Sequence, residues 1–239
     1  DGANLALLAR SETEGGKLEG TIHSVAEEVR AAGGQALPIG ADVRDADAVT
    51  AAVDRAAAEF GGIDVVVANA SALDFRSTGE VSVKRFDLMH AANPRGTFVR
   101  GKAAIPPLAK PPNPHIVALA PPLDIAPHWW GAHLPWLLSK MGMSLCIHAW
   151  SVELADKGIA ANGLWPRKTV ESAATARIGG SDLIRRSLKP TIMADAFHAI
   201  VTRPSRECTG RFFLDDAALL EAGVTDLSIY ANDPSATPY

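Results

Sequence analysis

The chain has 239 residues, of which 47% are apolar, a formal net charge of −4 and a sequence pI of about 6.0. This length fits one large α/β domain or two small ones, and the apolar content can fill a sizeable core. The slight acidity gives no long-range attraction to nucleic acid or to an anionic membrane, so we expect neither as a partner.

No apolar run reaches the roughly 20 residues needed to cross a bilayer, and the opening residues do not form a signal peptide. The two cysteines, Cys146 and Cys208, are far apart and fit no metal-ligand spacing, so we interpret them as buried free thiols. Two thiols without a disulfide framework are typical of a reducing compartment, which predicts a cytoplasmic protein.

The first part of the chain alternates short apolar runs with amphipathic segments. In chain order we expect a strand at residues 4–9, a helix at 21–32, a strand at 35–41, a helix at 45–60 and a strand at 63–68. Ile22, Val25 and Val29 share one face of the first helix, and Asp45 suits the N-cap of the second. Glycine pairs follow both helices, as expected where a helix ends.

The same alternation continues to the end of the chain. We expect a long helix at residues 82–109, a strand at 115–120, a helix at 136–155, a strand at 159–164, a helix at 191–202 and a strand at 211–214. Pro94 predicts a kink in the long helix. We expect residues 215–239 to form a loosely ordered tail.

Strands that alternate with helices indicate a parallel sheet with helices on both faces. The uninterrupted run Val65–Val66–Val67 is typical of a strand that is covered on both sides. With no internal repeat and no linker, the sequence predicts a single α/β domain over residues 1–239, a Rossmann-like doubly wound parallel sheet.

Several segments resemble the short-chain dehydrogenase/reductase family in their order and spacing. Residues 64–71 are similar to the family's Asn-Asn-Ala-Gly/Ser segment, residues 93–96 to its Asn-x-x-Gly segment, and residues 151–162 to the approach to its sixth strand. The hydroxysteroid-dehydrogenase-like sub-group is the most similar, on residues 17–22, 120–123, 141–145, 164–167, 208–210 and 223–227. The resemblance covers essentially the whole chain.

The resemblance implies a nicotinamide dinucleotide bound at the carboxyl ends of the strands. The family's first strand and Gly-rich turn are absent from this sequence, and that strand's place lies in mid-sheet, between residues 4–9 and 63–68. We therefore predict about 25–35 further residues upstream, the size of one βα unit. The alternative is a rearranged fold that closes the gap.

The resemblance also implies which residues contact the cofactor. Arg10 stands where an acidic residue favours NAD, and a basic residue there can pair with the 2′-phosphate of NADP, with Ser11 adding a hydroxyl. We therefore expect NADP rather than NAD, the alternative for Arg10 being a solvated loop arginine. The other expected contacts are Asp42, Val43, Asn69, Ala70, Lys140, Pro166 and Ser172.

In the family, a Tyr exchanges a proton with the substrate, a Lys one helical turn later assists it, a Ser polarises the substrate oxygen and an Asn anchors a water chain. By resemblance, Asn93 and Lys140 match two of these positions. Trp136 stands at the Tyr position and Ala120 at the Ser position. An indole N–H does not ionise in a useful range, so a severe loss of general acid catalysis is expected.

Two functions follow from the resemblance. The first is an NAD(P)-dependent oxidoreductase that acts on a carbonyl or alcohol substrate. The second is a catalytically impaired family member that binds a nucleotide or a partner. His133 is the best stand-in proton donor, although a surface role is an alternative. The resemblance further implies a homodimer or homotetramer formed through the helices at residues 82–109 and 136–155.

Overall fold

The strands of the protein are all parallel, as the computed structural model shows over residues 2–10, 12–13, 20–131 and 133–236. β1 (Leu5–Ala9) pairs with β2 (Ala36–Gly40), and a second sheet has the order β3 (Val65–Ala68), β4 (His115–Leu119), β5 (Ala160–Trp165) and β6 (Phe212–Leu214). The prediction of a single α/β domain with parallel strands is confirmed.

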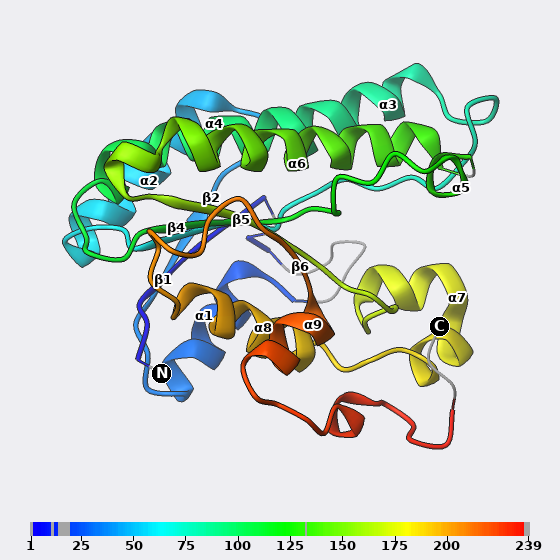
Figure 1. Cartoon of the computed structure of the whole chain (residues 1–239). Helices are drawn as coiled ribbons and strands as arrows, with labels where there is room; N and C mark the ends of the chain where they lie inside the picture. The colour runs from blue at the N-terminus through cyan, green and yellow to red at the C-terminus, as the bar shows by residue number, and fades with distance from the viewer. Residues whose placement is uncertain (1, 11, 14–19, 132, 237–239) are drawn as a thin grey trace.

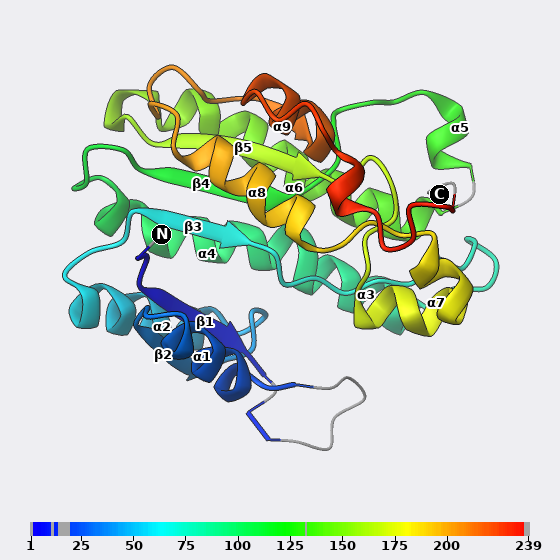
Figure 2. The ribbon, with the colours of Figure 1, turned by 90° about the horizontal axis from the view of Figure 1, so that it is seen from below.

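The sheet is divided between β1 and β3. The described residues place no strand between these two, and Figure 2 shows β1 and β2 set apart from β3, β4 and β5. Leu5 on β1 and Val67 on β3 are 40% and 42% exposed, as expected for side chains that lack a neighbouring strand. The division falls where the missing strand was expected, and the described strands do not rearrange to close it.

Helices cover both faces of the sheet, as Figure 1 shows. One face carries α2 (Ala46–Phe60), α3 (Val83–His90), α4 (Gly96–Leu108) and α6 (Leu134–Glu153), and the other carries α1 (Ile22–Ala31), α8 (Thr191–Val201) and α9 (Asp215–Glu221). Thr21 and Ser24 form a capping box at the start of α1, and Asp45 accepts two backbone N–H groups at the start of α2. None of the described helices is long and apolar enough to span a bilayer.

The helix predicted at residues 82–109 is two helices joined by a π-helical turn. The turn, η1 (Ala91–Arg95), contains Pro94, whose ring nitrogen has no hydrogen to donate to the preceding turn. Pro94, where we expected a kink, therefore lies in an irregular turn of the helix. Gly142 on α6 lies against it, because a Cβ there would come within 2.7 Å of the Pro94 ring. This close approach fixes η1 beside the middle of α6.

Within residues 215–236, the described part of the segment that we expected to be a loosely ordered tail, the structure has a helix and a short turn. Helix α9 and the short turn η3 (Ser228–Tyr230) pack on α8, and Leu219 and Tyr230 are almost fully buried. The apolar side chains of this segment cover α8, which explains the order. Three further elements were not predicted: α5 (Pro127–Trp130), η2 (Ala155–Lys157) and α7 (Ala173–Arg185).

Candidate active site

The residues expected at the site come together at one edge of the molecule. Asn69 and Ala70 directly follow β3, Ala120 follows β4 and Pro166 follows β5. Because parallel strands end at a common edge, these positions lie side by side. Arg10 at the end of β1 belongs to the same edge, on the far side of the division in the sheet.

Trp136, which we expected at the Tyr position, has an indole held between two aromatic rings. It lies 4.8 Å from Phe75 in an edge-on arrangement and 5.8 Å from Trp165, measured between ring centroids. Its Nε1 is buried and has no hydrogen-bond partner among the described residues. Ala120 is fully buried and its side chain has no hydroxyl to polarise a substrate oxygen.

Lys140 lies one helical turn after Trp136 and is 4% exposed. Its Nζ donates to the carbonyl oxygen of Leu119 at 2.7 Å, next to Ala120, and lies 5.4 Å from the centre of the Trp165 ring. Among the described residues, no carboxylate pairs with this ammonium. Burial, and then repulsion by Arg100, lower the pKa of Lys140 to about 7. Lys140 can therefore exchange a proton near neutral pH.

Asn93 connects the segment after β3 to α6. Its Oδ1 accepts from the backbone N–H of Ala72 at 2.7 Å, while its Nδ2 donates to the Ala72 carbonyl at 2.9 Å and to Ser139 Oγ at 2.8 Å. Ser139 in turn donates to the carbonyl of Trp136 at 2.7 Å. Asn93 thus bonds to the residue before Lys140, and no direct bond joins it to Lys140.

Two predicted cofactor contacts at the ends of β1 and β2, Arg10 and Asp42, belong to an ion-pair group with Arg44. Arg44 binds the Asp42 carboxylate through Nε and Nη2, and these bonds hold the pKa of Asp42 at about 2. Arg10 Nε lies 3.9 Å from Asp42, with 69% of its side chain exposed. Val43 is buried beside Gly96, where a Cβ would meet the Val43 carbonyl at 3.3 Å. Ser11 lies outside the described residues.

Ser172 has a local structural role in this structure. Its Oγ caps helix α7 by accepting from the backbone N–H of Thr175 at 3.0 Å, and it also shares a hydrogen bond with the Thr175 hydroxyl at 2.8 Å. Ser172 is exposed, and Pro166 is half-buried directly after β5.

His133, which we expected as the best stand-in proton donor, contacts a neighbouring segment. It forms a hydrogen bond through Nδ1 with the Phe75 carbonyl at 2.7 Å and packs on the Phe75 ring. In the segment before α6, Asp124 accepts from Trp129 Nε1 at 3.0 Å, and Trp129 is 59% exposed.

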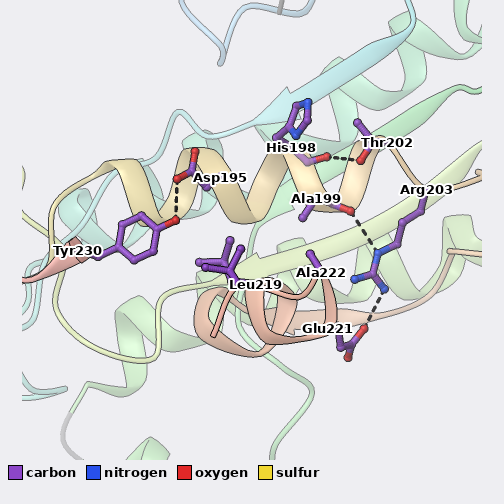
Figure 3. A pocket seen from close by; sticks show the side chains of 10 residues that line it. Asp195, His198, Ala199, Thr202, Arg203, Leu219, Glu221, Ala222 and Tyr230 are labelled. Carbon is purple, nitrogen blue, oxygen red and sulfur yellow. Dashed lines mark hydrogen bonds and ion pairs between the residues drawn. The ribbon is translucent and has the colours of Figure 1, made fainter. Parts of the chain in front are cut away.

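The one tyrosine in the described range lies elsewhere. Tyr230 lines an open cavity of about 470 Å³ between α8 and α9, where its hydroxyl donates to Asp195 at 2.7 Å (Figure 3). Burial and the Asp195 carboxylate raise the pKa of Tyr230 to about 12. In the same cavity Arg203 pairs with Glu221, so these polar groups satisfy one another. We assign no ligand to this cavity.

A family model described as enoyl-(acyl carrier protein) reductase matches residues 1–200. The chain belongs to the short-chain dehydrogenase/reductase family. It is 43% identical to hydroxysteroid dehydrogenase-like protein 2 of Xenopus laevis over 234 residues and 40% identical to the protein of that name from Homo sapiens. These alignments cover 98% of this chain and 56% of each relative, so the chain spans about half the length of the curated relatives it matches.

Solved structures of short-chain dehydrogenases agree closely with this fold. A putative dehydrogenase from Xanthomonas campestris superposes with a TM-score of 0.95 at 47% identity, covering all of this chain and 87% of that one. A short-chain dehydrogenase from Mycobacterium thermoresistibile gives 0.94 at 46% identity, covering all of this chain and 85% of that one.

Sequence reasoning missed three side chains that shape this short-chain dehydrogenase site. Phe75 and Trp165 hold the Trp136 indole, and Arg100 lies near enough to Lys140 to lower its pKa. A helical pattern could have indicated Arg100, because it lies seven residues after Asn93 and therefore on the same helix face.

Proposed function

We propose that this chain belongs to an NAD(P)-dependent oxidoreductase that transfers hydride between the nicotinamide and a carbonyl or alcohol carbon. The observation that carries the proposal is the position of Lys140, an ammonium without a carboxylate partner at the carboxyl edge of the strands. A nicotinamide dinucleotide carries phosphates, and the unpaired positive charges of Lys140 and Arg100 fit an anionic molecule at this edge.

The chain's own side chains would hold the substrate region and move a proton. The bound cofactor would supply or accept the hydride. Lys140 Nζ holds a proton beside the place of a substrate oxygen, and its low pKa allows it to give up that proton near neutral pH. Asn93 fixes the start of α6 through Ser139, and the rings of Phe75, Trp136 and Trp165 exclude water.

A second candidate is a catalytically impaired member that binds nucleotide or a partner. Two observations support it: position 136, which the resemblance aligns with the proton-donating Tyr, carries an indole whose buried Nε1 has no described partner, and Ala120 has no hydroxyl. In that case the site would bind a dinucleotide without turning over a carbonyl.

The test uses the protein at its natural length. NADPH binding is measured by calorimetry, and NADPH oxidation is followed by absorbance with a panel of aldehydes and ketones. Saturable binding with slow but enzyme-dependent oxidation supports the oxidoreductase. Binding without oxidation on any carbonyl supports the second candidate, and no binding of either dinucleotide contradicts both.

The preference for NADP is a separate proposal that rests on Arg10. We expect Arg10→Asp to weaken NADPH binding about 10-fold or more, because one charge-assisted contact with the 2′-phosphate is lost. NADH binding is expected to change little or to improve. Arg30→Asp, the same charge change on α1, is the matched control. Equal loss for both dinucleotides would contradict this role for Arg10.

We also propose that the protein forms a homodimer or homotetramer through α4 and α6. Phe98 on α4 and Leu145 on α6 are 49% and 56% exposed, so each of the two helices carries an apolar side chain that a partner could cover. We expect Leu145→Glu to reduce the mass found by light scattering to that of a monomer. Ile229→Glu, at a residue that is also 56% exposed but lies on η3, should leave the mass unchanged. An unchanged mass in both variants would contradict this interface.

A further inference from the structure

Asp215, the first residue of α9, is a buried carboxyl group with one oxygen that has no hydrogen-bond partner. The residue is 0% exposed. Its Oδ1 accepts from the backbone N–H groups of Arg167 at 3.0 Å and of Asp216 at 2.9 Å, whereas its Oδ2 is buried without a partner among the described residues. Burial raises the pKa of Asp215, and the two backbone N–H groups act in the opposite direction. A buried oxygen without a donor is costly, so a ligand that supplies the donor would be bound favourably.

Asp215 lines a cavity of about 290 Å³ at the carboxyl ends of β5 and β6. Leu188, Ile192 and Leu227 give this cavity an apolar wall, and Ile192 is almost fully buried. The volume is close to the lower end of the range for small-molecule sites, and an apolar wall with a few polar groups is typical of them. The cavity can therefore take a small organic molecule.

The charged side chains that line the cavity balance one another. Arg167 Nε donates to Asp216 Oδ2, so these two form an ion pair. The other two are Lys168, which is exposed, and Asp215, which is buried. Because two positive and two negative side chains surround it, the cavity favours a neutral molecule over an ion.

The cavity is separate from the candidate active site and from the divided part of the sheet. Neither Trp136 nor Lys140 lines it. β6 is the end of the four-stranded sheet opposite β3, and Figure 2 shows α9 and β1 on opposite sides of the molecule. The open edge of β3 therefore has no part in this cavity.

We propose that this cavity binds a small, neutral and largely apolar molecule through a hydroxyl group that bonds to Oδ2 of Asp215. The hydroxyl hydrogen supplies the donor that Oδ2 lacks, and the apolar part of the molecule packs on Leu188, Ile192 and Leu227. The site goes beyond the proposed function, because it needs no nicotinamide and no group of the candidate active site.

The experiment compares two probes, benzyl alcohol and its isomer anisole. Both have one aromatic ring and one oxygen, but only the alcohol has a hydrogen to donate. Binding to the natural-length protein is measured by calorimetry at constant pH without a cofactor. We expect benzyl alcohol to bind about 10-fold more tightly than anisole, because the ether cannot form the hydrogen bond to the carboxylate.

Asp215→Asn tests the role of Oδ2. The amide keeps an oxygen for the two backbone N–H groups and places an NH₂ group where Oδ2 was. That group can donate to the oxygen of either probe, so we expect the two probes to bind about equally. Without a probe the variant is expected to melt at the same or a higher temperature, because no carboxylate is buried. A lower melting temperature with an unchanged preference for the alcohol would overturn the proposal, since Asp215 would then be only structural.

Two leucine variants test the location. Ala231 lines the cavity, so Ala231→Leu is expected to fill it and to abolish binding of both probes. Ala194→Leu makes the same change at an exposed position of α8 outside the cavity and should bind like the natural protein. Binding of benzyl alcohol that persists in Ala231→Leu would overturn the proposal.

Two results with the natural-length protein would also overturn it. One is equal binding of the two probes, because Oδ2 would then contribute nothing. The other is no binding of benzyl alcohol, as when another part of the natural-length protein fills the cavity. NADPH takes no part in these measurements, so failure of this site and failure of the proposed oxidoreductase are distinguishable.

Discussion

The double variant Trp136→Tyr/Ala120→Ser is expected to oxidise NADPH with a carbonyl substrate about 10²-fold to 10⁴-fold faster than the natural protein. The change restores a phenol that can exchange a proton and a hydroxyl that can polarise the carbonyl oxygen. Position 136 is one turn before Lys140, so a tyrosine hydroxyl there would lie within reach of the ammonium. A nearby positive charge lowers the pKa of a phenol toward the working range.

The structure indicates that a tyrosine fits at position 136. The Trp136 indole leaves its Nε1 buried without a described partner, so its removal gives up packing but no hydrogen bond. Phe75 and Trp165 remain to contact the smaller ring. At position 120 the backbone N–H donates to Leu164, and a serine would keep that bond.

Trp129→Tyr is the matched control for this experiment, because it makes the same exchange at an indole that is 59% exposed. Its rate is expected to equal that of the natural protein. A natural protein that already turns over at the rate of the double variant would contradict the expected gain. The proton held by Lys140 would then suffice without a phenol, and Lys140→Met would abolish turnover in the natural protein.

The elements of the fold followed from local patterns in the sequence. The cap at Asp45, the glycines after the first two helices and the apolar runs of the strands placed most elements within a few residues. Helix α7 was missed because its first turn carries small residues without an apolar stripe, and its order depends on the Ser172 cap. Helix α9 was missed because its stability comes from packing on α8, which no local pattern reveals.

For the candidate site, too, the residues could be predicted from the sequence, but their contacts could not. Asn93, Lys140, Trp136 and Ala120 could be found because a family resemblance fixes their places along the chain. Their actual partners could not be found, since the bonds of Asn93 to Ala72 and of Lys140 to Leu119 join segments that are distant in sequence. The unpaired charge of Arg100 is also a tertiary property, because only the folded chain shows that no described carboxylate comes near it.

Lys140→Met is expected to stabilise the protein at pH 7 and to change how stability depends on pH. In the folded chain the pKa of Lys140 is about 7, against 10.5 for an ordinary lysine. Between these values the unfolded chain binds more protons than the folded chain, so the free energy of unfolding rises with pH. Below pH 7 the cost of the buried ammonium is present in full.

The variant removes this dependence. In the natural protein the contribution of Lys140 to the free energy of unfolding rises by at most about 1.4 kcal/mol per pH unit. In Lys140→Met that rise is absent. The clearest window is roughly pH 7 to 8.5, because burial lowers the pKa of His115 further below neutrality and raises the pKa values of Cys146 and Cys208. Urea unfolding in phosphate-free buffer at several pH values in this window measures the slope.

Lys102→Met, at an exposed position two residues after Arg100, is the matched control and should keep the slope of the natural protein. If Lys140→Met were less stable at pH 7 with an unchanged slope, the ammonium would be a net stabiliser whose bond to Leu119 outweighs its burial. Because no carboxylate in the described structure pairs with Lys140, we expect the buried ammonium to lower the free energy of unfolding instead. Such a cost agrees with the role in holding a proton that we propose for Lys140 at this edge of the sheet.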